Sequence, residues 1–234
     1  DIKSLADILN QNKKITVYCG IGAANGHDEL LQIAEKLKSP VGYSFRGKMT
    51  TQYDNPYEVG MTGLLGLPSA FQSMHEADVV LLLGTDFPYA NFMPAGKKII
   101  QIEERPERLG RRAKVDMGLC GKIEDTLKIL LPLLENKEDD SFLKKQLAKY
   151  ESVKKGLQVY VEDPGKENLI HPEFVADTIN RLADEDAIFT VDTGMCCVWG
   201  ARYIHATGKR KMLGSFSHGT MANAMPMAIG AALA

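Results

Sequence analysis

The sequence predicts an α/β fold: an open, mostly parallel sheet with helices on both faces, followed by a second, truncated α/β domain. The first supporting observation is a set of short, unbroken apolar runs, such as residues 79–83, which are typical of strands buried on both faces of a parallel sheet. The second is that segments with apolar residues at helical spacing lie between these runs. Strands that alternate with helices form parallel sheets, so both observations predict the same architecture.

The first domain is predicted to cover residues 1–135 and to begin with a β-α-β unit. A strand at 15–20 leads into a glycine-rich turn, a helix at 27–38 ends before Pro40, and a second strand runs from 41 to 44. The remaining elements are expected as a polar loop at 49–60, a helix ending near 75, strands at 79–83, 98–102 and 115–120, and a helix at 122–135.

A charge-rich break at residues 135–140 ends this domain. A helix at 141–158 and a polar stretch with Pro and Gly follow, and residues 136–168 are together interpreted as a linker. The second domain, residues 169–234, is expected to contain a helix opening at Pro172, strands at 187–191 and 212–216, a helix at 195–204 and a final apolar helix. Two strands do not make a stable sheet domain, and the last helix has no stop signal. We therefore expect an internal piece of a longer protein.

Composition narrows the class of protein. The 234 residues are 44% apolar and 25% charged, as in soluble globular proteins, and the net charge of −2 argues against a nucleic-acid-binding surface or a polybasic membrane patch. No stretch approaches the roughly 18 apolar residues of a membrane span, and the first residues do not form a signal peptide. The four cysteines lack metal-site spacing and are interpreted as reduced thiols of a cytoplasmic protein: Cys19, Cys120, Cys196 and Cys197.

Polar loops follow several predicted strands at their carboxyl ends, where open α/β sheets bind ligands. The turn at residues 20–26 has the spacing G-x-G-x-x-x-G, which could admit a phosphate or serve only as a structural turn. Loops at 62–65 and 84–89 could face a ligand or be an ordinary helix entry and strand corner. Glu103 could take both hydroxyls of a ribose or be a solvated carboxylate. Because all lie at one edge of the sheet, together they predict a nucleotide or dinucleotide site.

Several longer motifs are more specific than these loops. They are Arg46-Gly-Lys, Tyr53-Asp-Asn-Pro-Tyr57, Gly60-Met-Thr-Gly-Leu64, Gly84-Thr-x-Phe-Pro-Tyr89, Ile100-Gln-Ile102 and Gly214-Ser-Phe-x-His-Gly-x-Met-Ala-Asn-Ala-Met-Pro226. With them, the whole chain resembles the thiamine-diphosphate-dependent, FAD-containing enzymes, and most closely the bacterial pyruvate dehydrogenases (quinone) and pyruvate oxidases. The resemblance implies that residues 1–135 are the central FAD-binding domain and that residues 169–234 are the N-terminal part of the thiamine-diphosphate-binding domain.

The resemblance also implies cofactor-binding residues. The flavin site would be lined, largely through backbone groups, by Thr62, Gly63, Leu64, Leu65, Thr85, Asp86, Phe87, Pro88 and Tyr89. Further FAD contacts are expected from Gly20, Gly22, Arg46, Gly84 and Glu103, the last on the adenosine side, where the family has an aspartate. Thiamine diphosphate would meet Gly219, Thr220 and Met221, with Met221 beneath the thiazolium, and its diphosphate would lie near residues 192–194. No catalytic residue or metal ligand is expected in this chain, since the family's activating glutamate and its Mg²⁺ ligands lie outside it.

The implied activity of the full-length parent is decarboxylation of pyruvate on thiamine diphosphate, with electrons passed through FAD to a quinone or to oxygen. The isolated chain is expected to be inactive. Two alternatives stay open: an acetolactate synthase, whose FAD does no redox work, and a non-catalytic nucleotide-binding or assembly module. The resemblance further implies a homotetramer, with peripheral contact to the inner face of the cell membrane through a far C-terminal segment absent from this chain. The composition adds the expectation of a cytoplasmic protein that does not bind nucleic acid.

Overall fold

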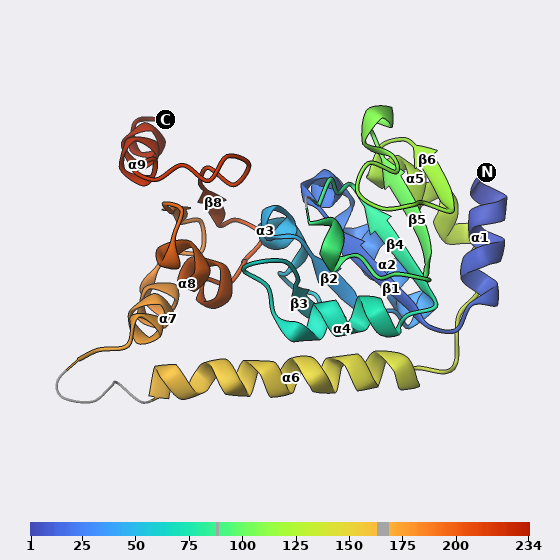
Figure 1. Cartoon of the computed structure of the whole chain (residues 1–234), viewed down its shortest axis with the longest axis horizontal. Coiled ribbons are helices and arrows are strands. Elements are labelled where there is room, and N and C mark those ends of the chain that lie inside the picture. The colour runs from blue at the N-terminus through green and yellow to red at the C-terminus, as the bar shows by residue number, and fades with distance from the viewer. Residues whose placement is uncertain (88, 163–168) are drawn as a thin grey trace. The chain divides into compact units, whose positions relative to one another are not determined.

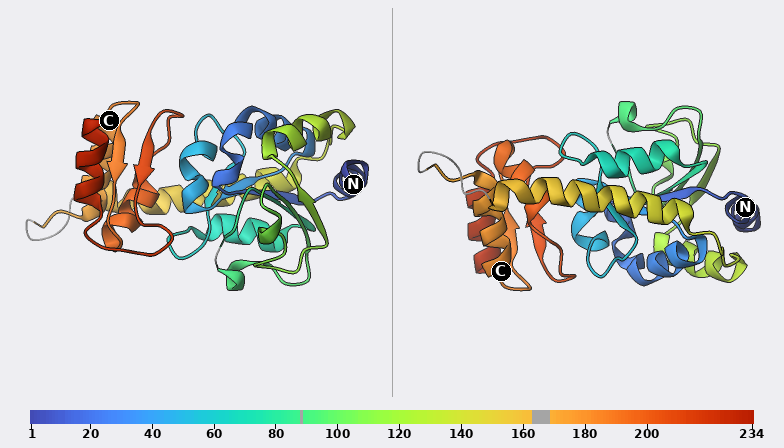
Figure 2. Two further views of the ribbon diagram at one scale, coloured as in Figure 1. Left: turned by 90° about the horizontal axis from the view of Figure 1, so that it is seen from above. Right: turned by 90° about the horizontal axis from the view of Figure 1, so that it is seen from below.

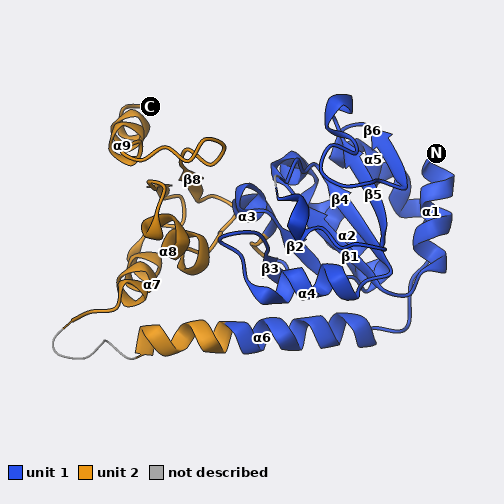
Figure 3. Ribbon diagram, in the orientation of Figure 1, with its two compact units in different colours: residues 1–51, 55–153 blue, residues 52–54, 154–234 orange. Residues whose placement is uncertain are grey.

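The structure is a computed structural model that describes residues 1–87, 89–162 and 169–234. The chain forms two compact units (Figure 3). Unit 1 comprises residues 1–51 and 55–153, and unit 2 comprises residues 52–54 and 154–234. Pro88 lies outside the described residues, as do the Pro and Gly of the predicted linker.

Unit 1 is built on a six-stranded sheet in which every pair of neighbouring strands is parallel (Figure 1). The order is β3-β2-β1-β4-β5-β6. The strands are β1 Ile15–Cys19, β2 Val41–Tyr43, β3 Glu58–Met61, β4 Val79–Leu83, β5 Lys98–Glu103 and β6 Met117–Cys120. The predicted mostly parallel sheet is thus confirmed.

One strand of this sheet was not predicted. β3 begins inside the stretch expected to be a polar loop, residues 49–60, so that expectation is wrong at its end. The strand is only four residues long, and Glu58 and Gly60 interrupt its apolar pattern. Its inner residue Val59 is nevertheless fully buried, and tertiary packing against α4 decides the structure there.

Helices cover both faces of the sheet. The helices of unit 1 are α1 Ile2–Gln11, α2 His27–Leu37, α3 Lys48–Thr51, α4 Pro68–Glu76, α5 Ile123–Leu130 and the first part of α6 Ser141–Glu162. Side chains alternate between the faces of a strand. Tyr18 and Leu82 therefore share one face, where they pack with Met74 of α4 and Phe142 of α6. Figure 2 shows α6 running across the side of unit 1 seen from below.

Two helices differ in length from the prediction for identifiable reasons. α5 ends at Leu130 rather than 135, because Pro132 cannot donate the next helical hydrogen bond and the chain continues as a short 3-10 turn. α6 continues to Glu162 rather than 158. Since Phe142 is buried in the core of unit 1, the helix expected as part of a linker also helps to build this unit.

Unit 2 contains a two-stranded parallel sheet, β7 Ile188–Thr190 and β8 Lys211–Leu213. Its helices are α7 Pro172–Leu182, α8 Met195–Tyr203 and α9 Ala224–Leu233, which confirm the elements expected there. No side chain of α9 is buried, and Leu233 is 83% exposed. Across the described residues, no helix is both long enough and apolar enough to cross a membrane.

Candidate functional site

The sheet order of unit 1 places a topological switch point between β1 and β4. From β1 the chain proceeds to β2 and β3 on one side, and it then returns to continue with β4, β5 and β6 on the other. In open parallel sheets, ligands bind in the crevice outside the carboxyl ends of the strands at this point. The two loops that border the crevice begin at Gly20 and Gly84.

Glycines allow these two loops to approach each other closely. A Cβ on Gly22 would lie 2.8 Å from the Cα of Gly84, and a Cβ on Gly20 would lie 2.4 Å from the Gly84 carbonyl oxygen. The Gly20 amide donates to Leu83 (2.9 Å) and the Gly22 amide donates to Gly84 (3.0 Å). Because these amides are already engaged, the geometry favours the structural-turn alternative for Gly20 and Gly22.

The loops after β3 and β4 also come together. Phe87 is 4% exposed, and its ring meets those of Tyr18 and Tyr89 edge to face, with centroids 5.5 and 5.4 Å apart. Gly63 lies against the same ring, and a Cβ there would be 3.0 Å from it. The structure therefore brings the 62–65 and 84–89 loops to one place. Phe87 fixes the second loop through packing.

Thr62 offers a buried polar atom at this junction. Its side chain is 4% exposed, and its hydroxyl oxygen has no hydrogen-bond partner within the described chain. Leu64, two residues later, is 66% exposed. A buried hydroxyl without a partner is costly unless a ligand or water satisfies it.

The carboxylate of Asp86 forms ion pairs with two arginines of the same unit. Arg112 donates to it at 2.9 Å, and Arg111 lies at 3.1 Å. Both arginines belong to the connection between β5 and β6, which is not part of the site predicted from the sequence. The sequence feature that could have indicated their role is a group of four arginines within eight residues: Arg105, Arg108, Arg111 and Arg112.

Glu103 is the last residue of β5 and is only 3% exposed, whereas Glu104 is exposed. One carboxylate oxygen, Oε1, accepts from the Arg105 amide (3.3 Å) and lies 3.7 Å from the Arg108 guanidinium. The other, Oε2, is buried and has no partner in the part of the chain that the structure describes. The carboxylate thus keeps one buried acceptor free at the carboxyl end of the sheet, which excludes the solvated-loop alternative.

Gln101, the central residue of the Ile100-Gln-Ile102 motif, is a further candidate site residue that was not among those predicted. It is 4% exposed, and its amide nitrogen donates to the carbonyl oxygens of Thr85 (3.2 Å) and Arg108 (3.3 Å). Its amide oxygen accepts from the Gly110 amide (2.9 Å). Gln101 therefore fastens the loop after β4 to the loop after β5. The sequence feature that could have indicated this role is a polar side chain between the apolar residues of the predicted strand 98–102.

Arg46 is exposed in the turn after β2, and the buried cation of that motif is Lys48. Burial lowers the pKa of Lys48 to about 8, and the nearby Glu58 carboxylate opposes this shift. The hydroxyls of Tyr43 and Tyr150 donate to Glu58, the second at 2.8 Å. Lys48 thus belongs to a buried polar cluster that ties β2, β3 and α6 together.

In unit 2, the loops after β7 and β8 meet in a similar way. Asp192 accepts from the amides of Asn223 (2.6 Å) and Ala224 (2.8 Å) and so caps the start of α9. Gly219 lies beside Thr193, since a Cβ on it would be 3.8 Å from the threonine methyl group. The predicted loop residues Gly219, Thr220 and Met221 are exposed. No cluster of metal-binding side chains occurs among the residues described.

Comparison with known proteins agrees with this architecture. Residues 2–130 match the thiamine pyrophosphate enzyme central domain, and residues 192–234 match the C-terminal TPP binding domain of the same enzymes. A solved structure from Mycobacterium smegmatis, described as that of a putative thiamin diphosphate-dependent enzyme, superposes with a TM-score of 0.71 over 99% of this chain and 44% of that one. At 20% identity, this likeness concerns the fold alone.

The curated relatives include enzymes with different activities. An uncharacterized protein of Pseudomonas amyloderamosa is 47% identical over 67% of this chain and 40% of its own. The acetolactate synthase large subunit of Corynebacterium glutamicum is 28% identical over 98% and 38%, and the pyruvate oxidase of Lactiplantibacillus plantarum is 27% identical over 99% and 39%. The chain thus spans about two fifths of the length of these relatives. By its match over residues 2–130, the chain belongs to the thiamine pyrophosphate enzyme family.

Proposed function

We propose that unit 1 binds FAD in the crevice at the carboxyl ends of β1 and β4. The observation that carries this proposal is the buried, unpartnered Oε2 of Glu103 at the end of β5. A carboxylate at this position of a parallel sheet accepts hydrogen bonds from ribose hydroxyls. The unpartnered hydroxyl of Thr62 supplies a second polar atom near the loop after β4.

In this proposal the residues of unit 1 bind and orient the cofactor. Glu103 accepts from the ribose, and the loops at 62–65 and 84–89 hold the flavin, largely through backbone groups. Phe87 and Tyr89 help to exclude water from that side, since the Phe87 ring is itself buried. Asp86 acts indirectly, because its carboxylate holds two arginines.

We further propose that the parent protein oxidises pyruvate and passes the electrons to a quinone or oxygen. Bound thiamine diphosphate would supply the decarboxylation chemistry and bound FAD the electron uptake. The loop Gly219–Thr220–Met221 would contact thiamine diphosphate, and Mg²⁺ ligands would come from outside this chain. The similarity to pyruvate oxidase supports this assignment.

Acetolactate synthase is the second candidate, because the similarity to that enzyme is about as strong. An activity assay of the full-length parent distinguishes the two candidate functions. The pyruvate oxidase proposal expects reduction of a quinone analogue or of oxygen when pyruvate is added. Formation of acetolactate without an electron acceptor would assign the parent to the second candidate.

The FAD proposal is tested by two matched variants of neighbouring glutamates. Glu103→Ala removes the buried acceptor, whereas Glu104→Ala removes an exposed carboxylate of the same type. Loss of a hydrogen bond to a charged group costs about 1.5–3 kcal/mol, which corresponds to roughly a 10- to 100-fold weaker affinity. We expect this loss for Glu103→Ala and less than about threefold for Glu104→Ala, measured by flavin absorbance after equilibrium dialysis with FAD. Equal retention by both variants would contradict the proposed role of Glu103.

A further inference from the structure

The turn that follows β5, residues 105–110, folds back onto the strand that it leaves and is called the β5 turn below. Gln101 and Glu103 are two residues apart on β5, so their side chains lie on the same face of the sheet. The Gln101 amide nitrogen donates to the Arg108 carbonyl oxygen at 3.3 Å. Oε1 of Glu103 accepts from the Arg105 amide, also at 3.3 Å. The β5 turn is therefore fastened beside the carboxylate that is proposed to meet the ribose.

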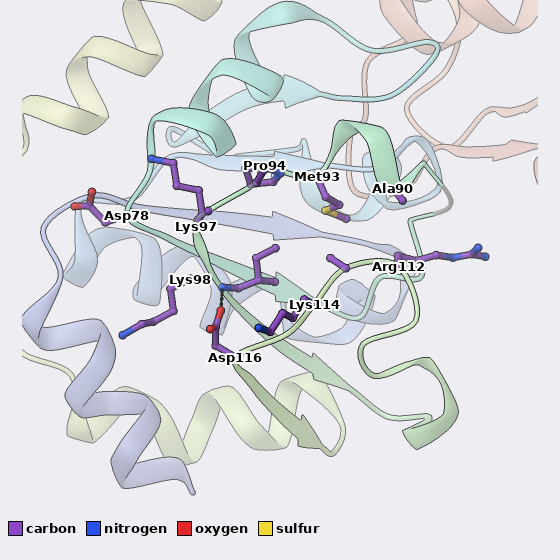
Figure 4. A pocket seen from close by; sticks show the side chains of 13 residues that line it. Asp78, Ala90, Met93, Pro94, Lys97, Lys98, Arg112, Lys114 and Asp116 are labelled. Carbon is purple, nitrogen blue, oxygen red and sulfur yellow. Dashed lines mark hydrogen bonds between the residues drawn. The ribbon is translucent and has the colours of Figure 1, made fainter.

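Further contacts hold the rest of the connection between β5 and β6. Arg111 and Arg112, which follow the β5 turn, pair with the Asp86 carboxylate at 3.1 and 2.9 Å. At the far end of the connection, the Asp116 carboxylate accepts from the Ile99 amide at 2.8 Å (Figure 4). Because the connection is held on both sides of the β5 turn, the main chain of this turn has a defined position.

Arg108 is the residue of the β5 turn whose side chain meets Glu103. Its Nη1 lies 3.7 Å from Oε1, and its side chain is 28% exposed. Among the residues that the structure describes, no other cationic side chain pairs with Glu103. A carboxylate buried as deeply as this one needs a cation and hydrogen-bond donors to offset the loss of water. Both partners act on Oε1, so Oε2 is the oxygen left for a donor of the ligand.

We propose that Arg108 is a positioning residue for the nucleotide, an inference that rests on the proposed binding of FAD at Glu103. Arg108 fixes the carboxylate through Oε1, so that Oε2 faces the ribose hydroxyls. Gln101 acts one step further away, since it holds the main chain of Arg108. The arrangement selects a nucleotide whose ribose hydroxyls are free to donate, because a carboxylate oxygen can only accept.

The first experiment measures how much the ribose hydroxyls contribute to binding. ADP and 2′,3′-dideoxy-ADP, which lacks both hydroxyls, are each titrated into the purified chain in a calorimeter. The parent chain should bind ADP roughly 10-fold or more tightly than the dideoxy nucleotide. Arg108→Met removes the guanidinium and should reduce this ratio by at least about threefold. Lys114→Met removes an exposed cation of the same connection (Figure 4) and should keep the ratio of the parent.

The ratio separates positioning from a structural role. A variant that merely loosens unit 1 weakens both nucleotides and leaves their ratio unchanged. An unchanged ratio in Arg108→Met, in a chain that binds FAD, overturns the role of Arg108 and leaves the flavin site standing. A parent chain that binds neither FAD nor ADP overturns the flavin site and this inference together.

A double-mutant cycle with FAD completes the test. FAD affinity is measured by equilibrium dialysis for Arg108→Met, for Glu103→Ala and for the variant that carries both changes. If Arg108 acts through Glu103, the double variant should bind FAD as weakly as Glu103→Ala alone, since the residue that Arg108 positions is already gone. Losses that add in the double variant would show that Arg108 affects the cofactor independently of Glu103, and they overturn the positioning role.

Discussion

Replacing Gly84 by alanine tests the close packing of loops at the switch point. Gly84 has φ +56°, which costs an alanine about 1–2 kcal/mol. A Cβ there would also lie 2.5 Å from the carbonyl carbon and 2.6 Å from the Cα of Gly22. Both contacts are with backbone, so a main-chain shift is needed, and overpacking of this kind costs about 1–3 kcal/mol. The expected loss of unfolding free energy for Gly84→Ala is therefore about 2–5 kcal/mol.

Gly96 provides a matched control for the backbone contribution. It has φ +69°, and a Cβ on it would meet no atom within 4 Å. Gly96→Ala should therefore show only the conformational cost, about 1–2 kcal/mol. The difference between the two variants isolates the collision with Gly22.

The assay is urea unfolding followed by far-UV circular dichroism, with hydrogen exchange of the β1 and β4 peptides as a local readout. With a urea slope of about 2 kcal/mol per M, Gly84→Ala should lower the midpoint by about 1–2.5 M. Faster exchange should appear in both peptides, since Gly20 and Gly84 extend the hydrogen bonding between these strands. If Gly84→Ala lowers the midpoint no more than Gly96→Ala does, the two loops are not packed as described.

Three further predictions concern other buried polar groups. Gln101→Met removes three hydrogen bonds between loops and should lower the free energy of unfolding by about 1–3 kcal/mol, with faster hydrogen exchange in the connection between β5 and β6. Lys48 has a pKa of about 8 in the folded chain and an ordinary value of 10.5. The unfolded chain therefore binds more protons between these values, and the stability relative to Lys48→Met should rise across that range by an amount on the order of 3 kcal/mol, measured by urea unfolding at each pH. Arg210, 8% exposed, donates to the Asn180 side chain (2.8 Å) and to the Ala183 carbonyl (2.6 Å) beyond α7; Arg210→Ala should lower the free energy of unfolding of unit 2 by about 2–4 kcal/mol, followed by Trp199 fluorescence in urea.

The parallel sheet could be predicted because its central strands carry the strongest local signal. β4 is apolar at all five positions and buried at all five, so its periodicity and its environment agree. In β3 the local sequence pattern and the environment disagree. The charge of Glu58 suggests a solvent-exposed position, but the hydroxyls of Tyr43 and Tyr150 donate hydrogen bonds to it within unit 1. The signal for this strand lies in residues distant in sequence, and local pattern does not contain it.

The candidate site likewise has features that the local sequence predicts and features that depend on residues distant in sequence. That the loops after β3 and β4 gather at one edge follows from parallel strands alone, and the structure brings Gly63 to Phe87. Which side chain remains free to meet a ligand depends on hydrogen bonds between loops. Asp86 and Glu103 are both carboxylates at the carboxyl edge of the sheet, but Asp86 pairs with two arginines, whereas Glu103 keeps one oxygen unpartnered.

The two edges of the sheet in unit 1 therefore differ in chemistry. At the carboxyl edge, the buried Oε2 of Glu103 lies near loops that pack closely through Gly22 and Gly84. This arrangement favours a ligand with a hydroxyl donor and leaves little freedom in the position of that donor. At the amino edge, the charged side chains of Lys98, Lys114 and Asp116 are exposed, so water can satisfy them. A buried unpartnered acceptor costs the unliganded protein about 1–3 kcal/mol, and solvated lysines cost it almost nothing. A ligand that donates to Oε2 of Glu103 removes this cost, and the gain contributes to its affinity. Because the stability that a ligand adds depends on its concentration relative to its dissociation constant, FAD should raise the free energy of unfolding of unit 1 less in Glu103→Ala than in the parent chain at the same FAD concentration.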